Sequence, residues 1–262
     1  MNVDQVARAT AFAALHRTAS PLVLFNIWDP GSARAVEAGG AMALATGSWS
    51  VAAAAGADDG EQLPFELVLG NLSRIVAAVD LPVTVDIERG YAADTDGVAA
   101  TVAAVIEAGA VGCNIEDGLP DGGLRSVSEQ VERIRQARRS AEATGAPFFV
   151  NARVDVFLQP SGEPHDDVLL ATAVARAQAY TEAGADGIFL PGLTDPRLIG
   201  AAVERCDRPL NVMVADGTPT LSDLRDLGVA RVSHGPGPYL AAMGFLQEAA
   251  TRAAALAPGV GQ

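Results

Sequence analysis

The chain has 262 residues, and its 18 basic residues are all arginine, so the sequence contains no lysine. This absence excludes enzymes that depend on a lysine amine, namely Schiff-base aldolases, pyridoxal enzymes and P-loop nucleotide hydrolases. The formal net charge of -14 disfavours binding to nucleic acids and to anionic membranes, both of which attract basic surfaces.

The remaining composition predicts a packed globular protein. Hydrophobic residues make up 49% of the chain and charged residues 19%, and we expect one domain over residues 1–262. No apolar stretch reaches the roughly 18 residues that a membrane span needs, and Met1–Thr10 lacks the layout of a signal peptide. The two cysteines, Cys113 and Cys206, are too few for a disulfide scaffold and lack the spacing of a zinc site. These features favour a cytoplasmic protein.

Helical and short apolar segments alternate along the chain. At four places a helix-like run ends at a glycine and leads directly into an apolar run, which is typical of a helix joined to a buried parallel strand. The predicted strands are Leu22–Ile27, Ala41–Ala45, Pro82–Ile87, Val111–Ile115, Pro147–Ala152, Gly187–Leu190, Pro209–Val214 and Ala230–Ser233. The predicted helices are Asp4–Arg17, Gly31–Ala38, Gln62–Val79, Asp94–Ala108, Ser126–Thr144, His165–Ala183, Pro196–Cys206, Thr220–Leu227 and Tyr239–Leu256.

Eight strands that alternate with eight helices in about 250 residues predict an α/β fold of the (β/α)8 TIM-barrel type. The additional N-terminal helix, Asp4–Arg17, is expected to cap the floor of the barrel. A doubly wound sheet is the competing architecture. It usually has a glycine-rich phosphate turn after its first strand, whereas here that strand leads into Asn26–Pro30 without such a turn.

Polar residues gather where the predicted strands end, and in a barrel of this type the active site forms at those ends. Because side chains alternate along a strand, Asp86 and Glu88 should both point into the barrel mouth, as should Asn114 with Glu116 and Asn151 with Arg153. Asn211 lies in the seventh strand, and the turn Thr46-Gly47-Ser48 follows the second.

Three carboxylates beside a single arginine need a cation to remain ionised together. Oxygen ligands without histidine or cysteine suit Mg²⁺ or Mn²⁺, so we predict a site formed by Asp86, Glu88 and Glu116. Arg153 offers a planar fork for a carboxylate or phosphonate. The backbone of Thr46–Ser48 could cradle an anion. The structural alternatives are that the carboxylates cap helices and that Arg153 pairs with Asp86 or Glu116.

Other motifs are interpreted as structural or as minor options. His234 is expected to be a packed residue at the end of a strand, and Cys113 a core residue. No G-x-S-x-G motif is present, which disfavours a serine hydrolase. The segment Gly235-Pro236-Gly237 could be the phosphate cradle that many barrels place after strand eight, which leaves a phosphosugar enzyme as a minor alternative.

Together these stretches resemble the isocitrate lyase / phosphoenolpyruvate mutase superfamily over nearly the whole chain. The matching segments are Glu37-Ala38-Gly39 leading to Thr46-Gly47-Ser48, then Gly56-Ala57-Asp58-Asp59, Pro82–Tyr91, Asn114-Ile115-Glu116-Asp117 and Asn151–Asp155. The resemblance implies a magnesium-dependent barrel that breaks a C–C or P–C bond in α-oxo acids, or in 2-hydroxy acids cleaved to them, through a metal-stabilised enolate.

The resemblance also implies roles for individual residues. Asp86 would bind the metal directly, Glu88 and Glu116 would reach it largely through waters, and Asp59 would lie on its other side. Thr46, with the amides of Gly47 and Ser48, would hold the substrate carboxylate, and Arg153 would clamp the same ligand. Asn211 would bind substrate, although the motif around it is displaced by a position. Asp59, Glu116 and Arg153 are therefore the catalytic candidates.

Departures from the family pattern guide the choice of substrate. The loop Gly118–Leu124 lacks the lysine, cysteine and histidine of the tricarboxylate lyases, and Pro191-Gly192 stands where those lyases carry a glutamate. We therefore expect a carbon–carbon lyase of a small oxo acid, with decarboxylation of oxaloacetate as the leading activity and Gly122-Gly123 giving the loop freedom to act as a lid. The alternatives are a phosphonopyruvate or 2-methylisocitrate reaction, and a non-catalytic protein that binds oxo acids.

The resemblance implies a homo-oligomer, a dimer or tetramer that exchanges C-terminal helices. Because the chain ends soon after Tyr239–Leu256, that exchange is expected to be curtailed.

Overall fold

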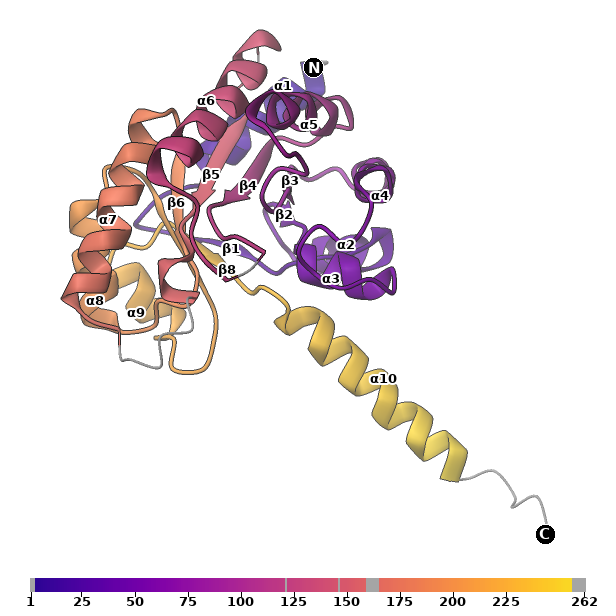
Figure 1. The fold of residues 1–262 in the computed structure, drawn as a ribbon. Helices are drawn as coiled ribbons and strands as arrows, with labels where there is room; N and C mark the ends of the chain where they lie inside the picture. Colours follow the sequence, from indigo (N-terminus) through magenta and orange to yellow (C-terminus); the bar gives the residue numbers. More distant parts are fainter. Residues whose placement is uncertain (1–2, 121, 146, 159–164, 256–262) are drawn as a thin grey trace.

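The computed structural model describes residues 3–120, 122–145, 147–158 and 165–255. Eight parallel strands form one sheet in the order β1-β8-β7-β6-β5-β4-β3-β2, and a parallel bridge between Ile27 and Thr46 joins β1 to β2. The sheet therefore closes on itself as a barrel (Figure 1). The strands are β1 Leu22–Leu24, β2 Leu44–Ala45, β3 Val83–Asp86, β4 Gly112–Glu116, β5 Phe149–Arg153, β6 Gly187–Leu190, β7 Leu210–Met213 and β8 Arg231–Ser233.

This arrangement confirms the predicted (β/α)8 barrel and excludes the doubly wound sheet. Each predicted strand and helix is present, with ends that differ by a few residues. The helices are α1 Val3–Ala14, α2 Pro30–Ala38, α3 Ser48–Ala54, α4 Phe65–Ala78, α5 Thr95–Glu107, α6 Val127–Ala143, α7 Asp167–Glu182, α8 Pro196–Arg205, α9 Leu221–Asp226 and α10 Gly237–Ala255, with a 3-10 turn η1 at Asp155–Leu158. Leu256 and the tail after it lie outside the described residues.

Two elements at the barrel mouth, α3 and η1, were not predicted. A turn was predicted at Thr46–Ser48, but the alanine-rich stretch that follows favours a helix, and α3 begins at Ser48. The turn η1 follows β5 directly and contains Asp155. Both elements therefore place polar groups beside the ends of strands β2 and β5.

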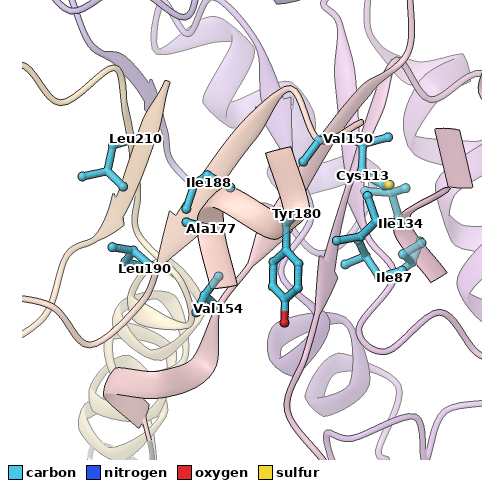
Figure 2. Close-up of a cluster of buried hydrophobic side chains, with 14 of the residues drawn as sticks. Ile87, Cys113, Ile134, Val150, Val154, Ala177, Tyr180, Ile188, Leu190 and Leu210 are labelled. Atoms are coloured by element: carbon cyan, nitrogen blue, oxygen red, sulfur yellow. The ribbon is translucent and has the colours of Figure 1, made fainter. Parts of the chain in front are cut away.

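The main core lies between the barrel wall and the surrounding helices. Figure 2 shows Cys113 and Val150 on the strands facing Ile134 of α6, with Tyr180 of α7 nearby. Burial raises the pKa of Cys113 to about 12, so this thiol is a core residue, as predicted. This outer core leaves the inward-facing side chains of the strands to form the barrel interior.

Helix α1 closes the floor of the barrel at the amino-terminal ends of the strands. Phe12 packs with the buried residues Leu22, Val111 and Phe149, and the Gln5 amide donates to the carbonyl oxygens of Ile106 and Ala110, at 2.7 and 3.0 Å. Helix α1 therefore closes the floor. A ligand site is left at the opposite end.

Helix α10 begins beside β8 and projects away from the barrel (Figure 1). Its side chains from Leu240 onward are almost all exposed, including the apolar Leu240, Met243, Phe245 and Leu246. The described part of the chain contains no helix with both the length and the apolar character needed to cross a bilayer.

Candidate active site

A cavity of about 170 Å³ lies at the carboxyl ends of the strands. Its polar and apolar lining residues come largely from different strands. Residues from β1 to β5 and the segments after them line the polar side: Asn26, Gly47, Ser48, Ser50, Asp59, Asp86, Asn114 and Arg153. The rest of the lining is largely apolar and comes from β6 to β8 and the segments after them, from η1 and from the start of α3. It consists of Trp49, Leu158, Phe189, Pro191, Met213, Ser233, Gly235 and Pro236.

Asp86 is the carboxylate at the end of β3, and it lies at the polar side of the cavity. Its Oδ1 accepts a hydrogen bond from the Glu88 backbone N–H at 3.1 Å, and its own backbone N–H donates to the hydroxyl of Thr46 at 3.0 Å. Burial raises the pKa of Asp86, and the nearby charge of Asp59 acts in the same direction, whereas Arg153 lowers it. A divalent cation beside this carboxylate would favour its ionised form.

Glu88 follows Asp86 by two residues, but its backbone leaves the strand conformation. Its φ of +48° lies in the left-handed region, as do those of Glu61 and Tyr91 at +62° and +48°. The Glu88 carboxylate accepts the Tyr91 hydroxyl and the Glu61 backbone N–H, both at 2.6 Å, and Tyr91 N–H donates to the Glu61 carboxylate at 2.7 Å. Three strained residues are thus held in one closed network, a feature that clusters at functional sites.

Burial raises the pKa of Glu88 to about 7. The Tyr91 hydroxyl lowers this pKa by donating to the charged carboxylate, and Asp86 and Asp59 raise it. Glu88 is therefore partly protonated near neutrality in the absence of a cation.

Arg153 ends β5 and is held by two acidic side chains. Its Nη1 lies 2.7 Å from a carboxylate oxygen of Glu116, and its Nε and Nη2 donate to both oxygens of Asp155, at 2.6 and 3.0 Å. Glu116 also lies 3.8 Å from Nη1 of Arg89. Burial raises the pKa of Glu116 even though the charge of Arg153 opposes that shift. Arg153 therefore forms the ion pair with Glu116 that was one of its two structural alternatives, and it also lines the cavity.

The donor groups of the site are hard oxygen atoms, which suit Mg²⁺ or Mn²⁺. Among the residues that the structure describes, no three acidic, histidine or cysteine side chains are grouped closely enough to hold a metal ion. The expected convergence of Asp86, Glu88 and Glu116 is therefore looser than predicted, because Glu88 and Glu116 are engaged by Tyr91 and Arg153. Of these three carboxylates, Asp86 alone lines the cavity, where Asp59 joins it. This set fits an ion that keeps most of its waters and contacts one carboxylate directly.

The predicted anion cradle at Thr46–Ser48 differs from expectation. The Gly47 N–H donates to the Ile27 carbonyl oxygen at 3.2 Å as part of barrel closure, and the Thr46 hydroxyl accepts from Asp86. The hydrogen of the Gly47 amide is thus already engaged, so holding a carboxylate with this amide would require that bond to break. Ser48 and the next two residues start α3, and all three line the cavity. Their backbone N–H groups lack helical partners, and that of Ser48 donates to the Asp86 carboxylate.

Two further expectations are corrected at β7 and β8. Asn211 is buried in the barrel interior, where its Oδ1 accepts from Ser233 at 3.2 Å, and Met213 lines the cavity instead. The Gly235 N–H donates to Asn26 and the Gly237 N–H to the His234 carbonyl oxygen. These bonds leave no backbone donor for a phosphate in that turn, so a phosphosugar site is not supported.

The remaining polar residues have structural roles or escaped sequence analysis. His234 contacts the ring of Phe25, with centroids 5.0 Å apart, as a packed residue. An antiparallel bridge joins Gly118 to Leu124, and no described residue of the loop between them lines the cavity. Asn26, Tyr91 and Asp155 were missed as site residues. Asn26 lies within the predicted first strand and is identified only by its distant partner Gly235, whereas Tyr91 and Asp155 lie within quoted motifs, close in the chain to Glu88 and Arg153.

The site can be compared with known proteins. The chain matches the phosphoenolpyruvate phosphomutase family over residues 12–254. A crystal structure from Burkholderia cenocepacia J2315, provisionally assigned as a phosphonomutase, is 51% identical, with 95% of this chain and 99% of that chain covered and a TM-score of 0.92. Oxaloacetate decarboxylase of Pseudomonas entomophila (strain L48) is 31% identical over 89% of this chain and 80% of its own length. A phosphonopyruvate hydrolase solved with oxalate and Mg²⁺ is 25% identical, with 94% and 86% covered and a TM-score of 0.81.

Proposed function

Because the chain belongs to the isocitrate lyase / phosphoenolpyruvate mutase superfamily, we propose that it is a Mg²⁺-dependent carbon–carbon lyase of a small α-oxo or 2-hydroxy acid. Decarboxylation of oxaloacetate is the leading activity. The observation that carries this proposal is the cavity lining, which combines the charged side chains Asp59, Asp86 and Arg153 with apolar residues that include Phe189, Pro191 and Met213. The family match and the decarboxylase relative support the reaction class.

Asp86 would hold the ion, with Glu88 and Glu116 acting on it from farther away. Asp59 lines the same cavity and acts electrostatically on Asp86, so it strengthens the negative potential that attracts a cation. When bound, Mg²⁺ or Mn²⁺ would supply positive charge that stabilises an enolate. The cation also removes the need for Glu88 to remain protonated, because it compensates the buried negative charge.

Arg153 would bind the carboxylate of the oxo acid. Three of its five N–H groups are occupied by Glu116 and Asp155, which leaves two to contact a ligand. The hydroxyl of Ser48 and the N–H groups of Trp49 and Ser50 would contact the same carboxylate, while the Ser48 N–H donates to Asp86. The ion pair with Glu116 fixes the guanidinium, so little side-chain entropy is lost when the ligand binds.

The apolar lining residues of the cavity favour decarboxylation over reactions in which the leaving part of the substrate keeps its charge. A departing carboxylate beside Phe189, Pro191 and Met213 would lose hydration, whereas carbon dioxide is uncharged and loses little. A phosphono group carries more negative charge and needs further cations, but Arg153 is the one basic side chain among the described lining residues. Phosphonopyruvate and 2-methylisocitrate chemistry therefore remain the alternatives.

An assay with oxaloacetate, phosphonopyruvate and 2-methylisocitrate, in Mg²⁺ and in chelator, tests this proposal. We expect turnover of oxaloacetate that requires Mg²⁺ and is lost in Asp86→Ala. Asp80→Ala is the matched control, because this exposed carboxylate lies near the opposite end of β3. Full activity in chelator would contradict the metal. Tight oxalate binding without turnover of any substrate would favour the alternative of a non-catalytic binding protein.

We also propose that the protein forms a homo-oligomer through α10. Large apolar side chains exposed along α10 would be stabilised by packing against another surface. A groove of about 640 Å³ beside β1 and α2, lined in part by Val23, Phe25, Val36 and Met42, offers such a surface on a second copy. In this arrangement the helix exchange would be extensive rather than curtailed.

A further inference from the structure

The barrel interior beneath the cavity contains a buried guanidinium. Arg231 lies on β8, in register with Leu22 of β1 and Asn211 of β7, and is 1% exposed. Its Nη2 donates to Oδ1 of Asn114 at 3.2 Å, while its Nε and Nη1 are buried without a hydrogen-bond partner among the described residues. Burying a charge that is incompletely hydrogen-bonded is costly, so its position calls for an explanation.

Arg231 acts on Asn114, which lies on β4 opposite Asp86 of β3 and Asn151 of β5. Oδ1 of Asn114 accepts two hydrogen bonds, from Arg231 and from Nδ2 of Asn151 at 2.9 Å. A flip of the Asn114 amide would aim its NH2 group at two donors. The network therefore fixes its orientation, with Oδ1 directed toward Arg231 and Asn151.

Asn114 is also a lining residue of the cavity. With Oδ1 occupied, the group that it can present to a ligand is Nδ2, a donor with two hydrogens. No hydrogen bond from this nitrogen to another described residue is present, and it is not among the buried unpartnered atoms. The register places it level with Asp86, at the floor of the cavity.

We propose that Asn114 donates a hydrogen bond from Nδ2 to an oxygen of the bound oxo acid, and that Arg231 and Asn151 are positioning residues that hold this amide from beneath. This inference rests on the proposed function and identifies a further contact in the same site. The oxygen concerned is one that gains negative charge when the carbon–carbon bond breaks. A preorganised donor aimed at such an oxygen stabilises the transition state.

The positive charge of Arg231 strengthens this donor. A hydrogen bond from a cation to Oδ1 polarises the amide and makes its N–H groups better donors, an effect that is larger in a buried setting. The same charge offsets part of the negative charge of Asp86, the acidic group that acts most strongly on Arg231. A neutral donor at position 231 would orient the amide but not polarise it.

Binding of oxalate in the presence of Mg²⁺, measured by calorimetry, provides the first test. We expect Asn114→Ala and Arg231→Met each to weaken oxalate binding about tenfold, the effect of one lost hydrogen bond of roughly 1.4 kcal/mol. In the double variant the loss should stay near tenfold rather than reach a hundredfold, because Arg231 acts through Asn114. With oxaloacetate, kcat should fall more than KM rises.

Arg138→Met is the matched control. Arg138 is largely buried and bonds to Gly184, Phe148 and Asp186 at the amino-terminal ends of β5 and β6, away from the cavity. It should reduce stability without changing oxalate affinity. Should Arg231→Met fail to fold, Asn151→Ala removes the other bond to Oδ1, and Arg231→Lys should recover part of the affinity because it keeps the charge.

A second measurement is independent of the ligand. In ¹⁵N-labelled, ligand-free protein, the side-chain amide resonance of Asn114, assigned by its loss in Asn114→Asp, should shift in Arg231→Met and remain unchanged in Arg138→Met. An unchanged resonance, or additive effects on oxalate affinity, would overturn the positioning role. Failure of the wild type to bind oxalate would overturn the proposed function and the ligand contact, while the resonance still decides the role of Arg231.

Discussion

Arg153 presents one edge of its guanidinium to Asp155, with Nε and Nη2 donating to the two carboxylate oxygens at 2.6 and 3.0 Å. The second side is held by Glu116, 2.7 Å from Nη1. A guanidinium anchored on two sides cannot rotate out of the site. Its two remaining N–H hydrogens are therefore fixed relative to the cavity before any ligand arrives.

Arg153→Lys is accordingly expected to fail, although it keeps the charge. A single ammonium cannot span Asp155 and Glu116 and also bind a carboxylate, so oxalate affinity in Mg²⁺ should fall about 100-fold, corresponding to the loss of one or two charge-assisted bonds. Calorimetry measures this change. Arg138→Lys, which perturbs the ion pair with Asp186 at the far end of the barrel, should bind normally. Full affinity in Arg153→Lys would contradict the clamp.

Asp58 and Asp59 provide a matched pair of neighbours. Both are exposed, but Asp59 lines the cavity and Asp58 does not. Asp59→Asn is expected to lower kcat/KM for oxaloacetate by about tenfold, a loss of roughly 1.4 kcal/mol, because it weakens the negative potential at the metal site. Asp58→Asn should stay within about twofold. Equal losses in the two variants would show that general surface charge is responsible.

Tyr91→Phe should weaken Mg²⁺ binding near neutral pH. In the wild type the Tyr91 hydroxyl lowers the pKa of Glu88 and helps to hold its left-handed backbone. Its removal should therefore raise that pKa above about 7 and free the Glu88 side chain. A reduction of about tenfold at pH 7 is expected, with partial recovery at pH 9 as Glu88 ionises. Titration of Mg²⁺ in the presence of oxalate measures both values. Tyr180→Phe, which removes a hydroxyl donor to the buried Asp117 outside the cavity, should leave the Mg²⁺ affinity unchanged.

The metal-free protein should lose stability as the pH rises from about 4.5 to 7. The pKa of Glu88 is raised from 4.5 to about 7, so the folded protein holds this proton more tightly than the unfolded chain does. Its contribution is complete below the unfolded pKa and is lost as the pH passes through the folded one, by about 3 kcal/mol at most. The raised pKa values of Asp86 and Glu116 act in the same direction.

Urea unfolding in chelator at pH 5 and pH 8 measures this loss. Glu88→Gln should reduce the difference between the two pH values, and Mg²⁺ should stabilise the wild type more at pH 8, where the carboxylates are ionised. The interpretation fails if Glu88→Gln retains the full pH dependence of the wild type.

Charges on α10 should dissociate the proposed oligomer. Phe245 and Leu246 are 70% and 59% exposed, and replacing both with glutamate places charge in the proposed interface. Light scattering after gel filtration should give the mass of a single subunit for this variant and a multiple of it for the wild type. Ser73→Glu with Ala77→Glu adds the same charge to the exposed face of α4 and should not change the mass. A wild type that is monomeric at micromolar concentration would refute the interface.

Much of the candidate site could be predicted because strand periodicity is local. Alternation placed Asp86, Asn114 and Arg153 on the inner face of the barrel, and the structure brings all three to the cavity. Depth along the strand was less predictable. Asn211 has the right face but lies too low, because stagger between neighbouring strands sets height and only strand pairing determines that stagger.

The sequence by itself determined the barrel, the polar ends of its strands and the exclusion of lysine chemistry, since these depend on composition and on repeats within a few residues. Tertiary structure alone decided which groups are still available to a ligand. The Gly47 N–H donates to the Ile27 carbonyl oxygen, and the Tyr91 hydroxyl holds Glu88 in a left-handed backbone conformation. Arg231 donates to Asn114 across the barrel. Hydrogen bonds set these states, and most of them join residues distant in the chain, including the bond from the Glu61 N–H to Glu88. Each donor and each acceptor can form only a limited number of such bonds.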